Sequence, residues 1–90
     1  MTEVKDVLAD RGARYGSYVE HAAIAMWLKD YIRAQLNRRQ KAIPSDQHHA
    51  LDVICDKIAR ILNGDPDYAD NWIDIAGYAT LVANRLEGKT

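Results

Sequence analysis

The sequence has no phenylalanine, one cysteine and two prolines in 90 residues. The single cysteine, Cys55, excludes a disulfide within the chain and fits a reducing compartment. Its neighbours Val53, Ile54 and Ile58 are apolar, which predicts a buried thiol rather than a reactive one. No apolar run approaches the roughly 20 residues that span a membrane, and the amino terminus shows no signal-peptide pattern. We therefore expect a cytoplasmic protein with no membrane partner.

The chain also has almost no net charge. Its 12 lysines and arginines nearly balance 13 aspartates and glutamates, which leaves a charge of -1 and a pI near 6.3. General nucleic-acid binders and proteins of anionic membrane surfaces carry a clear basic excess, so both classes are disfavoured. Positive charge is concentrated only in residues 29–41, which contain one acid. The basic residues of this segment are Lys29, Arg33, Arg38, Arg39 and Lys41.

Apolar residues recur at three- and four-residue spacing along most of the chain, which predicts helices and no strand. Glycine, proline and capping residues mark the expected ends, with Gly12 closing the first helix. The predicted helices cover residues 3–10, about 19–40, about 46–62 and about 68–86. The length and the apolar content fit one all-α domain over residues 1–90.

The last predicted helix is apolar on almost every side, with Trp72 and Ile75 on one face and Ile73 and Leu81 on another. A helix of this kind is normally buried, and three other helices of so short a chain offer too little cover. Gly77 would allow another backbone to approach closely. We therefore expect a helical hairpin or four-helix bundle that is completed in a homodimer or a higher oligomer.

Acidic residues gather around the predicted hairpin, where Asn63-Gly64 ends one helix and Asp67 is the expected cap of the next. Two pairs of aspartates have members four residues apart, so each pair shares a helix face. A divalent cation such as Mg²⁺ takes one or two carboxylates with phosphate oxygens and water. The candidate metal ligands are Asp52, Asp56, Asp70 and Asp74. The alternative is that these acids are solvated or dipole-stabilising residues, with Lys57 or Arg60 as the partner of Asp74.

The segment from Asp10 to Tyr18 joins two arginines, two glycines and two tyrosines, and leads into a Ser17-x-x-Glu20 capping box. Arginine offers a fork for phosphate, tyrosine offers a ring face, and a helix start presents free amides to an anion. The alternative is structural, with glycines as turn residues and His21 hydrogen-bonded and half-buried. The candidate nucleotide or phosphate contacts are Arg14, Tyr15, His21, Lys57 and Arg60.

Four segments together resemble a family of small phage and prophage proteins of undefined function. They are Arg14-Tyr-Gly, His21-Ala-Ala-Ile-Ala, Arg60-Ile-Leu-Asn-Gly-Asp-Pro and Asp70-Asn-Trp-Ile-Asp-Ile-Ala-Gly-Tyr-Ala-Thr-Leu. More distantly, the chain is similar to the all-α nucleoside triphosphate pyrophosphatases of the MazG and dimeric dUTPase kind. That resemblance implies an oligomeric helical bundle, Mg²⁺ held by acids of adjacent helices, and hydrolysis of a nucleotide to its monophosphate and pyrophosphate.

Within this resemblance, Asp70 and Asp74 match the acidic start of the last core helix. Lys57 and Arg60 match basic positions of the helix before it. The pyrophosphatases carry an E-x-x-E pair on that preceding helix, where this chain has only two aspartates four residues apart.

We therefore expect a phage or prophage nucleotide-binding protein of MazG-like fold. If the protein is an enzyme, the expected activity is that of a Mg²⁺-dependent nucleoside triphosphate pyrophosphohydrolase. Two alternatives stay open. One is a non-enzymatic protein that sequesters a nucleotide or docks on a host protein. The other is a purely structural helical oligomer whose acids cap and solvate its helices.

Overall fold

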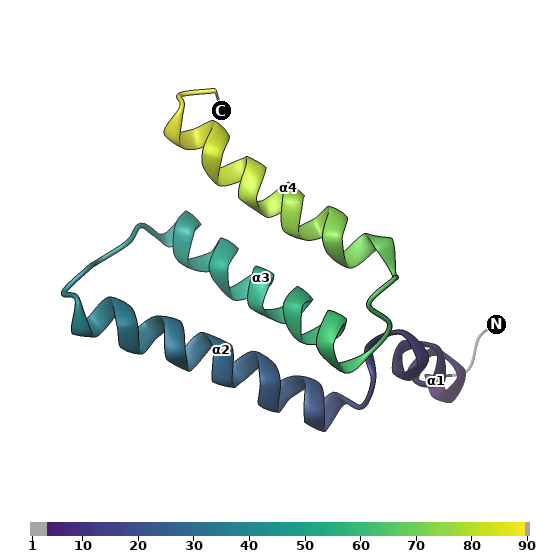
Figure 1. Ribbon diagram of the computed structural model, residues 1–90. Coiled ribbons are helices and arrows are strands. Elements are labelled where there is room, and N and C mark those ends of the chain that lie inside the picture. Colours follow the sequence, from purple (N-terminus) through teal and green to yellow (C-terminus); the bar gives the residue numbers. More distant parts are fainter. Residues whose placement is uncertain (1–3, 90) are drawn as a thin grey trace.

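The computed structural model describes residues 4–89, apart from the side chains of residues 6, 9, 11 and 13, and over this range it contains helices and no strand (Figure 1). The helices are α1 (Val4–Tyr15), α2 (Tyr18–Arg38), α3 (Ser45–Asn63) and α4 (Ala69–Leu86). The predicted all-α class is confirmed. Residues 1–3 and 90 of the predicted domain, including the first residue of the first predicted helix, lie outside the described residues. Between residues 4 and 89, no helix combines the length and the apolar character needed to cross a membrane.

The first helix continues past its predicted end at Asp10. Gly12 lies inside α1, and the left-handed conformation that ends the helix occurs at Gly16, where φ is 78°. The Gly16 amide donates a hydrogen bond of 2.8 Å to the Gly12 carbonyl. Each of the other three helices begins and ends within two residues of the predicted positions.

Two helix starts differ in how they are capped. At α2 the Glu20 amide donates to Ser17 Oγ at 3.2 Å, as expected from the capping pattern. At α4 the N-cap position is occupied by Tyr68 rather than Asp67. The Asp67 amide instead donates to the Asp65 carboxylate at 2.9 Å, so an aspartate at the first position of the turn organises it.

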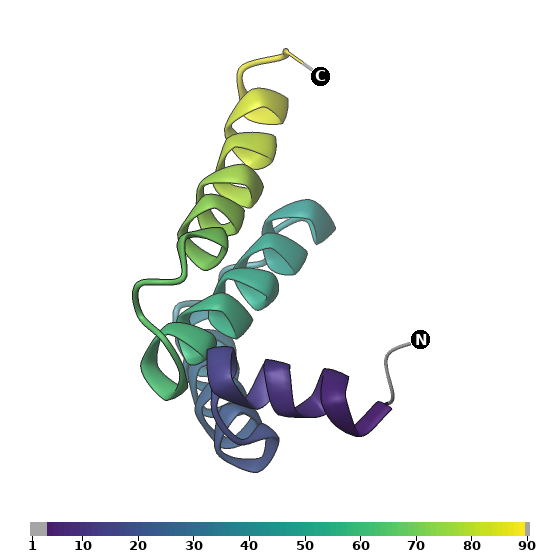
Figure 2. The same cartoon turned by 90° about the vertical axis from the view of Figure 1, so that its right-hand side faces the viewer.

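Helices α2, α3 and α4 form a single layer with α3 in the middle (Figure 1). Helix α3 packs against both neighbours, whereas α2 and α4, which are described along their whole length, do not contact each other. Helix α1 crosses the end of the layer where α3 ends and α2 begins (Figure 2). The four helices of one chain therefore do not close around a common core as those of a four-helix bundle do.

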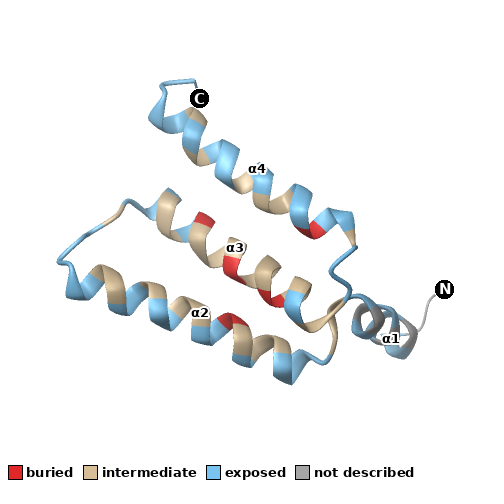
Figure 3. Ribbon diagram, in the orientation of Figure 1, coloured by how far each residue is buried: buried red, intermediate tan, exposed pale blue. Residues whose placement is uncertain are grey.

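Few residues of the described chain are buried, and most of these lie on α3 (Figure 3). They are Ala25, Ala50, Cys55, Ala59 and Asn71. The burial predicted for Cys55 is confirmed, since it is 2% exposed. Helix α4 is covered only on its α3 side, and Trp72, Ile73 and Leu81 remain exposed. The radius of gyration is 15.3 Å, against about 12 Å for a compact 90-residue domain.

Candidate functional site

Two turns that are distant in sequence lie against each other at the end of the layer. One turn contains Gly16, between α1 and α2, and the other contains Gly64, directly after α3. A Cβ atom at Gly16 would overlap the Asn63 carbonyl, and one at Gly64 would overlap the backbone of Arg14. The Asp65 amide also donates a hydrogen bond of 2.7 Å to the Arg14 carbonyl. We call this contact between residues 14–17 and 63–65 the turn junction.

The side chain of Asn63 fixes the turn junction. Its Nδ2 atom donates to the carbonyl oxygens of Tyr15 and Ser17, at 2.9 Å in each case. A side-chain amide has two N–H donors, and both are used here. From the sequence, Asn63 was identified only as a helix end. The Asn-Gly pair signalled a turn, but not the distant carbonyls that the side chain would bind.

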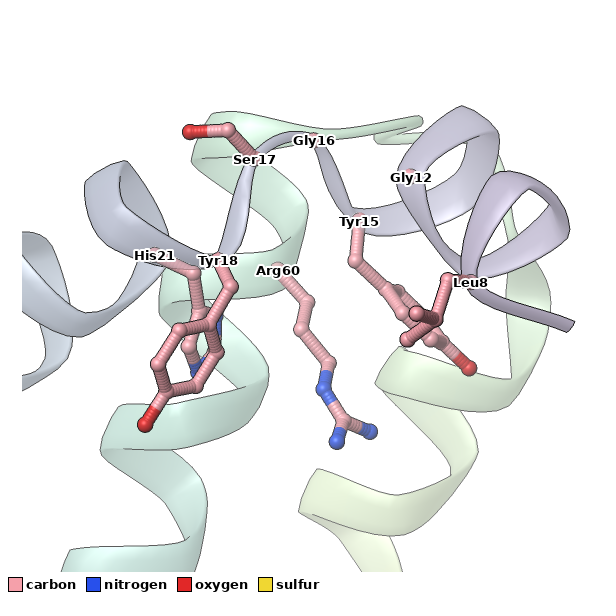
Figure 4. Close-up of a pocket in the computed structure, with 8 residues that line it drawn as sticks. All are labelled: Leu8, Gly12, Tyr15, Gly16, Ser17, Tyr18, His21 and Arg60. Atoms are coloured by element: carbon pink, nitrogen blue, oxygen red, sulfur yellow. The ribbon is translucent and has the colours of Figure 1, made fainter. Parts of the chain in front are cut away.

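A pocket of about 420 Å³ opens beside the turn junction, within the size range of small-molecule sites (Figure 4). Arg60 extends from α3, and its guanidinium lies between the side chains of α1 and those of the first turn of α2. We call this cavity the turn pocket. Its lining residues are Leu8, Gly12, Tyr15, Gly16, Ser17, Tyr18, His21 and Arg60.

Aromatic rings lie on both sides of the Arg60 guanidinium in the turn pocket (Figure 4). The Arg60 guanidinium lies 4.5 Å from the centre of the Tyr15 ring, a cation–π contact. The rings of Tyr18 and His21 are stacked, with centroids 6.4 Å apart and planes at 26°. Because α2 begins beside the pocket, the partial positive charge of its amino end also favours an anion there. The pocket therefore combines ring faces with two sources of positive potential.

The structure brings three of the five predicted phosphate contacts together, since Tyr15, His21 and Arg60 all line the turn pocket. Arg14 is directed to the neighbouring Tyr68, whose ring centre lies 5.1 Å from its guanidinium. Lys57 lies elsewhere, on the α4 side of α3. Tyr18 also lines the pocket, although the sequence analysis placed it in the segment from Asp10 to Tyr18 and not among the candidate contacts. Its place beside the Ser17 cap and three residues before His21 was the available signal.

The two predicted acids on α3 are paired with basic residues of α2. Asp52 lies 3.5 Å from the Arg33 guanidinium, and Asp56 lies 2.9 Å from Lys29 Nζ. His21 Nε2 is 4.0 Å from the same Asp56 carboxylate. Two of the five residues of the basic segment, Lys29 and Arg33, therefore pair with the acids of α3.

The two predicted acids on α4 also have partners. Asp74 forms an ion pair of 2.9 Å with Lys57, one of the two partners expected from the sequence. Asp70 accepts a hydrogen bond of 2.9 Å from the Tyr68 hydroxyl, and this bond raises the pKa of Tyr68. Helix α4 therefore places its acids against α3 and the preceding turn rather than against the α3 acids.

Among the residues that the structure describes, no three His, Cys, Asp or Glu side chains come together as metal ligands. As placed, the four predicted acids do not fit a Mg²⁺ ion, because a cation would have to displace their present partners from the carboxylates. The assignment of Mg²⁺ to these residues stays a prediction.

Comparison with known proteins identifies a family. The model of a protein family described as a domain of unknown function, DUF6378, matches residues 1–86. No curated protein and no solved structure matches the chain. The matched residues include both halves of the turn junction.

Proposed function

The chain belongs to the family described as a domain of unknown function, DUF6378, and from the geometry of the turn pocket we propose that it binds a nucleotide, or a similar molecule with an aromatic ring and a phosphate group. One observation carries the proposal. The Arg60 guanidinium enters the pocket between the ring of Tyr15 and the stacked rings of Tyr18 and His21 (Figure 4).

Each feature of the pocket has a part in such binding. A guanidinium donates two parallel hydrogen bonds to a phosphate. The contact with the Tyr15 ring restricts the orientation of the Arg60 guanidinium. An exposed ring such as Tyr18 offers a stacking face for a base, worth about 1–3 kcal/mol. The amino end of α2 adds attraction for the same anion.

The paired acids support binding without conversion of the ligand. The pyrophosphatase resemblance requires Mg²⁺ at aspartates, and in this chain the aspartates already contact lysine, arginine or tyrosine. We therefore expect binding that does not depend on Mg²⁺. Hydrolysis of a nucleoside triphosphate is the outcome that would replace this proposal with the enzymatic one.

The test is to incubate the protein with a mixed panel of ribo-, deoxyribo- and cyclic nucleotides, with and without Mg²⁺, and to analyse the retained and filtered fractions by chromatography. We expect retention of an unconverted nucleotide under both conditions. New monophosphate and pyrophosphate would establish the hydrolase instead. A panel in which nothing is retained or converted would overturn nucleotide binding.

A substitution links any binding to the pocket. Arg60→Met keeps the aliphatic stem and removes the guanidinium, so we expect at least about a tenfold weaker affinity, the value of one charge-assisted hydrogen bond. Arg39→Met is the matched control, since Arg39 is exposed at the opposite end of α2. Equal affinity of the Arg60→Met protein and the control would contradict the assignment of the pocket.

A further inference from the structure

Within the layer, the pair of helices α2 and α3 has one charged side and one apolar side. On α3, Asp52 and Asp56 turn toward the basic residues of α2. Apolar residues at helical spacing follow the other side of α3, away from these two acids. They are Leu51, Ile54, Ile58 and Leu62, of which Leu62 is 66% exposed.

Helix α2 continues this apolar side. Ala23, Ile24, Trp27 and Leu28 form an apolar groove of about 380 Å³ together with Leu62 of α3. Trp27 is 66% exposed, like Leu62. Its ring stacks on that of Tyr31, with centroids 5.7 Å apart, which extends the ring surface one turn along α2. We call the α3 stripe and this groove the apolar face.

The exposed area is too large for a closed monomer. The chain exposes 6575 Å², whereas a folded monomer of 10.2 kDa exposes about 5,300 Å². The excess of about 1,300 Å² is more than the roughly 800 Å² that each partner buries in a standard stable interface. One further protein surface of ordinary size would therefore bring the chain to the exposure of a typical folded protein.

The fold also lacks a second layer. A stable domain normally packs two layers of secondary structure around one core, and this chain supplies one layer with α1 across its end. A second copy would supply the missing layer, since it has the same apolar face. The net charge of -1 gives two copies little reason to repel each other.

We infer that a second copy of this chain packs on the apolar face, so that two single layers enclose one shared core. The contact is isologous, with the groove around Trp27 and Leu62 of each copy facing the apolar face of the other. The charged side of each layer, with its ion pairs between α2 and α3, stays outside the shared core. The proposal is independent of the nucleotide proposal, because the turn pocket lies on different residues.

Sedimentation velocity and light scattering across about 1–100 μM protein test this interface. We expect a dimer in that range, and a melting temperature that rises with protein concentration, since dissociation accompanies unfolding. A monomer at every concentration, with a melting temperature that does not change, would overturn the proposal and leave the face for a different protein.

Two substitutions locate the interface. Leu62→Glu and Trp27→Glu each place a charge on the apolar face at a side chain that is mostly exposed in one chain. We expect at least a tenfold weaker dimer for each. Val4→Glu, at an exposed apolar residue of α1 outside the layer, is the matched control and should leave the dimer intact. Dimers of unchanged strength in both face variants would show that this face is not the interface, and helical circular dichroism of each variant distinguishes dissociation from unfolding.

Discussion

The turn junction makes its contacts within the chain, whereas the apolar face leaves its large side chains exposed. At the turn junction, backbone atoms of residues 14–17 and 63–65 contact each other and their hydrogen bonds are made within the chain. At the apolar face, large side chains such as Trp27 and Leu62 remain exposed. The comparison teaches that a chain can define its local backbone geometry completely while its hydrophobic core is still incomplete.

The largest effect should come from breaking the turn junction at its closest contact. In Gly64→Ala, the new methyl group overlaps the backbone of Arg14 and Tyr15, which cannot move without opening the junction. We expect a loss of about 3 kcal/mol or more in the free energy of unfolding, measured by urea denaturation. Gly12→Ala is the control, because its Cβ meets no atom within 4 Å in α1, and we expect a gain of up to about 1 kcal/mol there. Similar stabilities for the two variants would refute the close contact.

A smaller loss of stability is expected when the turn junction keeps its backbone shape but loses the Asn63 side-chain donor. Asn63→Asp replaces the Nδ2 amide with a carboxylate oxygen that faces the carbonyls of Tyr15 and Ser17. We expect a loss of about 2 kcal/mol by urea denaturation, because two carbonyl acceptors, one part-buried and one exposed, lose their donor. Asn37→Asp, on the exposed surface of α2, should change the free energy by less than about 1 kcal/mol. Equal losses in both variants would mean that a general effect of charge, and not the lost donor, is being measured.

The reactivity of Cys55 measures how well the centre of the layer is buried, in contrast to the exposed apolar face. Burial raises the pKa of Cys55, so less thiolate forms at a given pH than in an unfolded chain. We expect iodoacetamide to react about 100-fold more slowly with the native protein than with the urea-unfolded protein at pH 8. The raised pKa also means that stability should fall as the pH rises above about 8.5, the value of a free thiol. Rapid native alkylation would place Cys55 on the surface.

The smallest expected effect concerns the far end of the layer, where Arg85 of α4 makes two hydrogen bonds, of 2.7 and 2.8 Å, to Asp46 of α3. These bonds lower the pKa of Asp46, so their stabilisation is present above about pH 4 and is lost as the pH falls through the lowered value. Asp46→Asn should therefore lower the melting temperature slightly at pH 7 and leave it unchanged near pH 2. Asp30→Asn, at an exposed residue of α2, is the control. A loss that is the same at both pH values would exclude the ion pair as its cause.

Sequence analysis predicted what depends on neighbours along the chain. The helices follow from apolar periodicity, the Ser17 cap follows from its own four-residue pattern, and the Lys57–Asp74 pair follows from two helices joined by one short turn. All of these involve groups that lie near one another in sequence or across one hairpin.

Contacts between distant segments could not be predicted in the same way. Gly12 and Gly16 are equivalent in a local pattern, and only the approach of Asn63 and Gly64 makes the second one the end of α1. The cations that neutralise Asp52 and Asp56 come from α2, whose rotation relative to α3 is set by packing. The candidate site was therefore predicted as two sets of residues, phosphate contacts and acids. Only three of the phosphate contacts, Tyr15, His21 and Arg60, converge on a pocket.

The turn junction also has a consequence for the order of events in folding. The two backbone segments of the junction are separated in sequence by the whole of α2 and α3. Bringing them together therefore costs much chain entropy unless the two helices have already packed antiparallel. We therefore expect the α2–α3 hairpin to form first and the junction to close after it. The Asp65 amide proton, bonded to the Arg14 carbonyl, exchanges with solvent only when this closure reverses. Its exchange rate thus measures how often the pocket end of the molecule opens while the helices remain folded.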